Sequence, residues 1–430
     1  MARVLPLKGL RYNPAIVKDL ARVVTPPYDV IDRDAQERYY DKHPYNIIRL
    51  EYGKTFPDDD ETNNVYTRAR ETFQSWRQNG VLLKEQEEAL YLYEQEFTVN
   101  GKTFTRRGFF CRTYLQPYSE GEILPHEETL PKAKEDRLKL LRACRANFSP
   151  IFGVYRDPDM TIDKVLTGAA AREPDIELRD EESQLHRLWV ITDKEAINRV
   201  AYVMLQKRIY IADGHHRYET ALAYSQEQKR LGLHHSVLMT LVNLHDPGLV
   251  ILPTHRLIKS PRPVSGETVT REIQDHFDVK KMEVDPARLK SFMGSLHKAG
   301  KHAFGLYTGQ GDMYLLRLKE SVDLNRLMPD NKSDAWCHLD VAVLHHLLLE
   351  RYFGIGAIER SSDDLVKYTQ EEETALGHVD RGEYDFAFFL NPTGVEEMIA
   401  VAEAGDKMPQ KSTYFYPKLI TGLVIHAFDL

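Results

Sequence analysis

A short stretch of the sequence, Asp213-Gly-His-His-Arg217, combines residue types that bind phosphate with the spacing of a helix start. An apolar run over residues 209–212 precedes it, and small and apolar residues at helical spacing follow it. The start of a helix presents unpaired backbone N–H groups and the positive end of the helix dipole to an anion. A glycine lets the backbone pass close to a ligand, and an arginine can hold a phosphate in a bidentate fork. The pattern therefore predicts a phosphate pocket on a strand, a tight turn and a helix; a plain turn with surface histidines is the alternative.

A second stretch, residues 124–147, places His126 and Glu127 between two prolines and just before a basic helix. The helix is predicted over residues 134–145, with its apolar residues inward and Arg137 among the arginines on its flanks. A surface helix with salt bridges explains most of these charges. It explains less well a histidine and an acidic pair in the preceding turn, which is therefore a candidate catalytic segment.

Two further polar groups lie near apolar strands. Thr254, His255 and Arg256 are at the end of one predicted strand, where α/β proteins usually bind ligands, although a plain polar strand end explains them equally well. The run over residues 408–418 interleaves lysines and hydroxyls with aromatic residues, a set suited to a phosphoryl or carboxylate group; a plain solvated loop is the alternative. The residues of this run assigned to substrate binding are Lys411, Ser412, Thr413 and Lys418.

The adjacent histidines His345 and His346 fall in a strongly apolar predicted helix. The partner one helical turn away is Glu350, four residues after His346, and two ligands do not make a metal site. We interpret the two histidines as packing or surface residues.

The elements that must position these groups alternate between strands and helices. A hairpin gives the strongest signal, because Asn100-Gly101 separates two runs of alternating residues between Leu90 and Tyr114. Residues 46–51 are predicted to be a strand, and residues 63–79 a helix with one buried apolar face. We expect a mixed α/β (α+β) protein with an N-terminal α/β segment over residues 1–95, a phosphate-binding core over 96–260 and a C-terminal α/β domain over 261–430.

The composition limits the classes of function. The chain has 430 residues, of which 42% are hydrophobic and 28% charged, as in a soluble globular protein of two or three domains. Its net charge of −8 argues against general binding to nucleic acid, which normally requires a basic excess. Three cysteines without metal-ligand spacing, and no secretory or membrane-spanning apolar run, predict a cytoplasmic protein.

Five runs of the sequence together resemble the DUF1015 family of uncharacterised bacterial and archaeal proteins, and the match spans nearly the whole chain. These runs cover residues 26–31, 126–129, 211–221, 252–256 and 408–418. Residues 115–260 also resemble the ParB/sulfiredoxin superfamily, most closely its free serine kinase branch, through the turn at Asp213 and the Pro-His-Glu segment. That resemblance implies a ParB/sulfiredoxin-like α/β core whose turn holds nucleotide phosphates, and a catalytic base at Glu127. This chain is far longer than free serine kinases, and the long separation of its two motifs departs from their pattern.

The resemblance implies an Mg²⁺-dependent phosphotransferase between an adenine nucleotide, ATP or ADP, and serine or O-phosphoserine, in either direction. The residues expected to bind the nucleotide phosphates are Asp213, Gly214, His215, His216 and Arg217, with Asp213 also holding Mg²⁺. Glu127 would exchange a proton with the acceptor hydroxyl, and His126 would orient Glu127. The residues expected to bind the substrate are Lys132, Lys134, Arg137, Thr254, His255, Arg256, Lys411, Ser412, Thr413 and Lys418.

Two other functions fit the same residues. A nucleotide-binding switch of the ParB-like type would bind nucleotide and change its association state without small-molecule turnover. A phosphatase would use the same basic pocket with water as the acceptor and would not require a nucleotide. The sequence has no convincing DNA-binding helix-turn-helix, and it leaves the oligomeric state open, homo-oligomers included.

Overall fold

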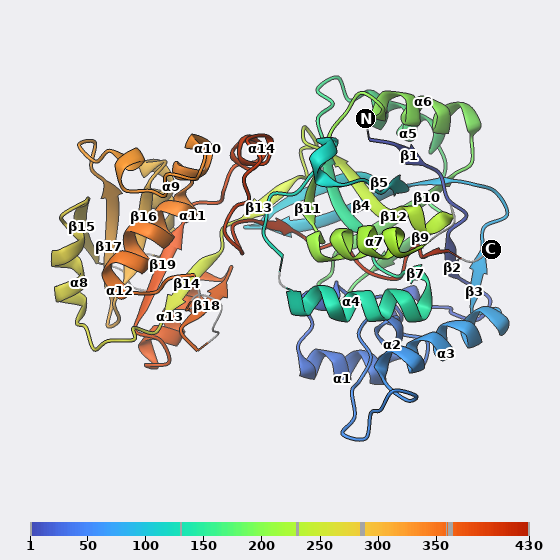
Figure 1. The fold of residues 1–430 in the computed structure, drawn as a ribbon, viewed down its shortest axis with the longest axis horizontal. Helices are drawn as coiled ribbons and strands as arrows, with labels where there is room; N and C mark the ends of the chain where they lie inside the picture. Colours follow the sequence, from blue (N-terminus) through green and yellow to red (C-terminus); the bar gives the residue numbers. More distant parts are fainter. Residues whose placement is uncertain are drawn as a thin grey trace. The chain divides into compact units, whose positions relative to one another are not determined.

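The backbone of this computed structural model divides into two units, each described here by itself (Figure 1). The structure describes residues 2–129, 131–228, 232–283, 289–357, 359 and 364–428. The first unit comprises Met1–Pro125, Thr129–Val250 and Pro417–Leu430, and the second comprises His126–Glu128 and Ile251–Tyr416. Residues 1–95 and most of the predicted core therefore share the first unit, while the division into three parts stays a prediction.

The first unit is built on a mixed sheet of nine strands, counted over the described residues. Its order is β6-β11-β8-β12-β5-β4-β10-β9, with β1 paired to β5, and the pairs β6–β11 and β8–β12 are parallel. The strands are β1 (Val4–Leu5), β4 (Leu90–Val99), β5 (Lys102–Tyr114), β6 (Ile123–Leu124), β8 (Ile151–Tyr155), β9 (Ile176–Arg179), β10 (Leu185–Ile191), β11 (Ile209–Asp213) and β12 (Ser236–Asn243). The mixed α/β class expected from the sequence is confirmed.

The predicted hairpin joins β4 to β5. Asn100 has φ 51° and Gly101 φ 77°, the left-handed conformations that a two-residue turn of this kind requires. One face of the sheet packs against the apolar sides of three helices and forms the main core. These helices are α5 (Thr161–Ala169), α6 (Lys194–Met204) and α7 (His215–Glu227).

A second core in this unit lies between the second and third of the N-terminal helices and α4 (Pro131–Cys144). The N-terminal helices are α1 (Arg33–Lys42), α2 (Ile48–Glu51) and α3 (Val65–Gln78), and the short strands are β2 (Leu10–Tyr12), β3 (Leu82–Lys84), β7 (Ala146–Asn147) and β21 (His426–Ala427). The expected strand over residues 46–51 is wrong, because this segment forms α2, whose first N–H at Ile48 donates to the Asn46 side chain at 3.0 Å. A short apolar run that is buried all round carries no periodicity to separate helix from strand.

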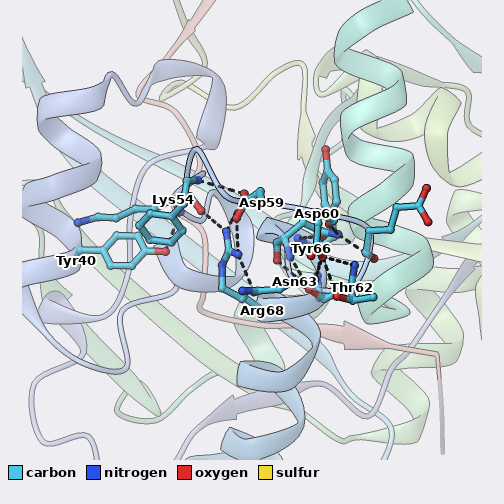
Figure 2. A network of polar contacts seen from close by, with 12 residues as sticks. Tyr40, Lys54, Asp59, Asp60, Thr62, Asn63, Tyr66 and Arg68 are labelled. Atoms are coloured by element: carbon cyan, nitrogen blue, oxygen red, sulfur yellow. Dashed lines mark hydrogen bonds and ion pairs between the residues drawn. The ribbon is translucent and has the colours of Figure 1, made fainter.

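A polar network fixes the loop before α3, as Figure 2 shows. The Arg68 guanidinium binds both carboxylate oxygens of Asp59 at 2.6 and 3.0 Å and also the Lys54 carbonyl at 2.9 Å. At the start of the same helix, the Tyr66 hydroxyl donates to Asp136 on α4 at 2.8 Å. The loop and α3 therefore support α4, which packs against α7.

The second unit contains an antiparallel sheet of six strands among the residues described, in the order β15-β17-β16-β19-β14-β18. The strands are β14 (His255–Ile258), β15 (Phe277–Glu283), β16 (Ala303–Tyr307), β17 (Asp312–Leu318), β18 (Val366–Thr369) and β19 (Phe386–Leu390). The short strands β13 (Val250–Leu252) and β20 (Tyr414–Tyr416) form a separate pair. The helices are α8 (Gly266–Ile273), α9 (Leu289–Ala299), α10 (Asp334–Cys337), α11 (Asp340–Val343), α12 (Arg351–Phe353), α13 (Glu372–Asp380) and α14 (Val395–Glu403).

A π-helical segment over Leu344–Glu350 joins α11 to α12, so the predicted apolar helix is continuous. His345 is buried inside it, whereas His346 lies 3.0 Å from the Glu350 carboxylate. These positions agree with the interpretation of the two histidines as packing and surface residues.

Candidate functional site

The predicted strand, turn and helix are present around Gly214, which separates β11 from α7. Gly214 has φ +93°, a left-handed conformation that other residues adopt only with strain. A Cβ at this position would lie 3.0 Å from Nε and from Nη2 of Arg217. A glycine is therefore needed here for two reasons: the backbone is left-handed, and a Cβ would crowd the Arg217 guanidinium that lies against it.

The Asp213 carboxylate is held between two cations. Its Oδ1 accepts from the Lys418 ammonium at 2.5 Å, and its Oδ2 accepts from Arg217 Nη2 at 2.7 Å. Burial by itself raises the pKa of Asp213, but the Lys418 and Arg217 charges outweigh burial and hold the pKa well below its usual range. Asp213 therefore remains ionised at neutral pH and keeps two positive side chains at the start of α7.

The guanidinium of Arg217 is used within the protein. While Nη2 donates to Asp213, Nη1 donates to the Pro150 carbonyl at 2.5 Å. Burial lowers the pKa of Arg217, but the nearby acidic groups, Asp213 and Asp29 first among them, raise it by more, so the net shift of the pKa is upward. Both terminal nitrogens of Arg217 thus hold the turn, each with one hydrogen bond to a protein oxygen.

The two histidines of the motif are the first residues of α7. His215 is 6% exposed, and His216 is half-buried. Burial lowers the pKa of His216, although the Glu219 and Asp29 carboxylates raise it in part. His216 is therefore mainly neutral at pH 7, so the fixed positive charge of this turn comes from Arg217 and Lys418.

The basic wall expected on α4 is only partly directed to solvent. Lys132 is exposed, and Lys134 is half-buried with its ammonium 2.9 Å from the Glu219 carboxylate. Thr129 donates to the same Glu219 oxygen at 2.7 Å. Glu219 on α7 thus holds the start of α4.

The placement of Arg137 on a helix flank was wrong, because its side chain is 8% exposed. It donates to the Glu51 carbonyl at 2.8 Å and to Asp136 at 2.6 Å, and its guanidinium carbon lies 4.0 Å from the centre of the Tyr28 ring. A buried arginine must be paired in this way, since an unpaired buried charge is costly. Arg137 therefore has a structural role in this arrangement, through its contacts with Glu51, Asp136 and Tyr28.

Sequence reasoning did not single out Tyr28 and Glu51 as site residues. Glu51 is 4% exposed, accepts from the Ser149 hydroxyl at 2.8 Å, and has its pKa raised by burial. A cavity of about 40 Å³ is lined by Glu51, Ser149, Arg137 and Arg217, which leaves room for a few water molecules. The signal for Tyr28 was available, because it lies in the run over residues 26–31 that resembles the DUF1015 family.

In the second unit, Glu127 contacts the loop that carries Lys411. The Lys411 N–H donates to Glu127 Oε1 at 3.2 Å, and its carbonyl accepts from Arg256 Nη2 at 3.0 Å. Lys411 is exposed and has φ +58°, a conformation that costs a non-glycine residue on the order of 1 kcal/mol. A strained, exposed lysine held from both sides is typical of a functional loop.

Other side chains hold the same loop. His126, which is fully buried, has its Nε2 2.9 Å from the Thr413 hydroxyl, and its carbonyl accepts from the Met408 N–H at 2.7 Å. The Ser412 carbonyl accepts from Thr393 at 3.0 Å. The structure therefore brings His126 and Glu127 together with Lys411, Ser412 and Thr413, which lie far from them in the sequence.

The polar strand end at residues 254–256 is buried. Thr254 is 3% exposed, His255 0% and Arg256 1%. Burial lowers the pKa of His255, whose Nε2 lies 3.8 Å from the Glu372 carboxylate. His255 and Arg256 begin β14, directly after Thr254, and β14 is antiparallel to both of its neighbours. The ligand-binding crevice at the carboxyl ends of parallel strands is therefore not found here, and burial argues against direct contact of these residues with a substrate.

The expected substrate set is thus divided between the units. Lys418 lies in the first unit with Asp213, whereas Lys411, Ser412 and Thr413 lie in the second. As for the metal, no group of three or more His, Cys, Asp and Glu side chains that could hold an ion occurs among the described residues. Asp213, the residue expected to hold magnesium, carries one cationic hydrogen-bond partner on each carboxylate oxygen, Lys418 on Oδ1 and Arg217 on Oδ2.

Several solved structures are similar to this chain. A mutant free serine kinase in complex with AMP has 15% sequence identity and a TM-score of 0.36, with 74% of this chain and 92% of that chain covered. Another mutant of free serine kinase, in complex with ADP, has 13% identity and a TM-score of 0.35, again with 74% of this chain and 92% of that chain covered. A conserved hypothetical protein from Pyrococcus furiosus has 14% identity and a TM-score of 0.32, covering 74% and 95%.

Searches among curated proteins give no match. None of the helices in the described part of the chain is long and apolar enough to cross a membrane. The sequence profile of a family described as a protein of unknown function, DUF1015, matches residues 4–342. Because this match covers most of the chain, the protein belongs to the DUF1015 family.

Proposed function

We propose that the protein is a phosphotransferase acting between an adenine nucleotide and serine or O-phosphoserine. The arrangement of Asp213 with Arg217 and Lys418 at the start of α7 is the observation that carries the proposal. It combines a glycine turn, the N–H groups of a 13-residue helix and two fixed cations, which together suit a polyphosphate. The resemblance to free serine kinases supplies the substrate class.

Phosphoryl transfer needs phosphates held in place, developing charge neutralised and a hydroxyl aligned with the transferred group. In the proposed complex the nucleotide phosphates lie at the N–H groups of His215 and His216. The Lys418 ammonium has three N–H donors, so it can bind a phosphate oxygen while it keeps its contact with Asp213. Arg217 contributes charge at the turn without leaving Asp213 and Pro150.

The proposed phosphoryl transfer can run in either direction. Forward, the serine hydroxyl oxygen forms a bond to the terminal phosphorus of ATP, the bond from that phosphorus to the bridging oxygen breaks, and ADP leaves. The hydroxyl proton passes to a base. In reverse, phosphoserine transfers its phosphoryl group to ADP, and the serine oxygen takes a proton back.

Glu127 is the proposed base, as the resemblance to free serine kinases implies. One of its carboxylate oxygens accepts from the Lys411 N–H, which fixes the orientation of the side chain. Lys411 is exposed and suits the carboxylate or phosphate of an amino-acid substrate. Magnesium is offered in the assays below as the companion of the nucleotide, and no step is assigned to it.

Phosphorus NMR of the purified protein tests the proposal. The protein is incubated with Mg²⁺ and O-phosphoserine, with ADP in one tube and without it in another, and a Lys418→Met variant is run beside it. We expect ATP to appear only in the tube that contains ADP and only with the unsubstituted protein. Free phosphate in both tubes would instead identify a phosphatase. No turnover, together with nucleotide binding that changes the association state, would identify a nucleotide-dependent switch.

A further inference from the structure

A stripe of buried polar side chains crosses three strands of the first unit. Arg106 on β5 lies directly opposite Gln95 on β4, and Gln95 lies opposite His186 on β10. The three residues are 2%, 1% and 0% exposed. Polar groups buried to this extent need hydrogen-bond partners, because leaving one unpaired costs about 1–3 kcal/mol.

The partners of two of these side chains are backbone carbonyls near the C-terminus. Arg106 Nη2 donates to the Pro417 carbonyl at 2.6 Å, and Gln95 Nε2 donates to the Lys418 carbonyl at 3.1 Å. The two side chains also bind each other, through Arg106 Nη2 and Gln95 Oε1. Two consecutive peptide carbonyls are therefore fixed by one cross-strand pair.

The same face of the sheet binds this segment at a third point. The Ile420 N–H hydrogen-bonds to the hydroxyl of Tyr93, which lies two residues before Gln95 on β4. His186 Nδ1 is 2.7 Å from the same hydroxyl, and its Nε2 is 3.0 Å from the Asp180 carboxylate. Residues 417–420 thus follow a path that buried side chains define.

Burying the charge of Arg106 costs free energy, which hydrogen bonds and packing must offset. Burial lowers the pKa of its guanidinium to about 10, which shows how strongly its charge is desolvated. Its guanidinium carbon lies 4.8 Å from the centre of the Phe152 ring, a favourable cation–π distance. An apolar residue would fill this position without desolvation of a charge, but it would leave the Pro417 carbonyl without this donor.

We propose that Arg106 and Gln95 are positioning residues that hold Lys418 at the phosphate turn. This inference rests on the proposed function, in which Lys418 binds a nucleotide phosphate. Once the carbonyls of Pro417 and Lys418 are fixed, the Lys418 side chain extends to Asp213. Neither Arg106 nor Gln95 touches the nucleotide; both act through Lys418.

The first test measures the position of Lys418 without any nucleotide. The whole protein is treated briefly with acetic anhydride, and acetylation of Lys418 is quantified by mass spectrometry. Gln95→Met removes one hydrogen bond to the segment with little change in volume, and Arg106→Lys keeps the charge but loses the planar fork. We expect both variants to raise the acetylation rate of Lys418 severalfold, because its ion pair with Asp213 loosens.

Arg107→Met is the matched control. Arg107 neighbours Arg106 on β5, but its side chain is 46% exposed and pairs with Glu94 at 2.8 Å. We expect its replacement to leave acetylation of Lys418 unchanged. The inference is overturned if folded Gln95→Met protein labels Lys418 at the rate of the unsubstituted protein, and this variant decides the question if Arg106→Lys does not fold.

The second test measures the affinity for ADP in a double-mutant cycle. Gln95→Met should weaken binding severalfold and by no more than the roughly 10- to 100-fold expected for loss of the Lys418 contact with phosphate, because Gln95 acts only through Lys418. In the Lys418→Met background the same change should have almost no further effect. An equal loss in both backgrounds would show that Gln95 acts independently of Lys418. If the unsubstituted protein binds no adenine nucleotide while labelling still depends on Gln95, the proposed function fails and the positioning role stands.

Discussion

The Lys418 ammonium lies 2.5 Å from the Asp213 carboxylate, although 205 residues separate them in the sequence. Each side chain is 14% exposed, so the pair is shielded from solvent and from screening by salt. Residues near the C-terminus therefore supply one of the two cations at Asp213, and a strand, turn and helix alone would lack it.

Replacing this ammonium should weaken nucleotide binding. For Lys418→Met we expect the Kd for ADP to rise about 10- to 100-fold, because a charge-assisted contact with phosphate is lost. Isothermal titration calorimetry measures the change. Lys194→Met, at an exposed position on α6, is the control and should leave the Kd unchanged. Equal affinities for Lys418→Met and the unsubstituted protein would remove Lys418 from the proposed site.

Gly214→Ala should affect both stability and binding. A left-handed residue other than glycine costs about 1–2 kcal/mol, and here the new Cβ also meets the Arg217 guanidinium at 3.0 Å. Gly121→Ala is a matched control, since Gly121 has φ +73° and a Cβ there would meet nothing within 4 Å. We expect urea unfolding to show a larger loss for Gly214→Ala, and only this variant to bind ADP more weakly. Equal effects of the two substitutions would argue against a special role for the turn.

Glu127→Gln separates two roles of the glutamate. The amide keeps an oxygen that can accept from the Lys411 N–H, but it cannot take up a proton at neutral pH. If Glu127 is the base, kcat should fall about 10²- to 10⁴-fold in Glu127→Gln and in Glu127→Ala, with the midpoint of unfolding preserved in the Gln variant. Nearly full turnover in Glu127→Gln together with loss in Glu127→Ala would show that Glu127 only holds the loop.

Acid should destabilise the first unit through His426. Burial lowers the pKa of His426 from its ordinary value of 6.5 to about 4. As pH falls below about 6.5, the unfolded chain binds a proton at His426 that the folded chain does not. The contribution of neutral His426 to the free energy of unfolding is therefore complete above pH 6.5 and is lost as the pH falls towards 4. The free energy of unfolding should decrease by about 3 kcal/mol over this range.

Urea unfolding at a series of pH values checks this expectation. His426→Phe removes the titrating group, so its stability should fall less steeply between pH 6.5 and 4. His245→Asn, at an exposed position, should keep the steep dependence of the unsubstituted protein. Identical pH profiles for His426→Phe and the unsubstituted protein would rule out His426 as the cause.

Local patterns in the sequence were sufficient for several elements. The strand, turn and helix around Gly214 and the hairpin at Asn100-Gly101 are set by interactions between near neighbours, so periodicity and turn chemistry predicted them. The family was identified for a similar reason, because its motifs are short and contiguous in the sequence. By contrast, residues 46–51 were predicted as a strand and form α2, since burial on all sides erases the periodic signal.

The sequence by itself determined that a glycine turn follows a buried strand and begins a helix, with an arginine one turn later. The tertiary structure alone decided which charges meet there: Arg217 turns back to Asp213 and Pro150, Arg137 is buried against Glu51, and Lys418 comes from the far end of the chain. Contacts between residues so far apart depend on how the sheet and its helices pack. A buried charge must find a partner wherever that packing places one, and no local pattern records which partner it is.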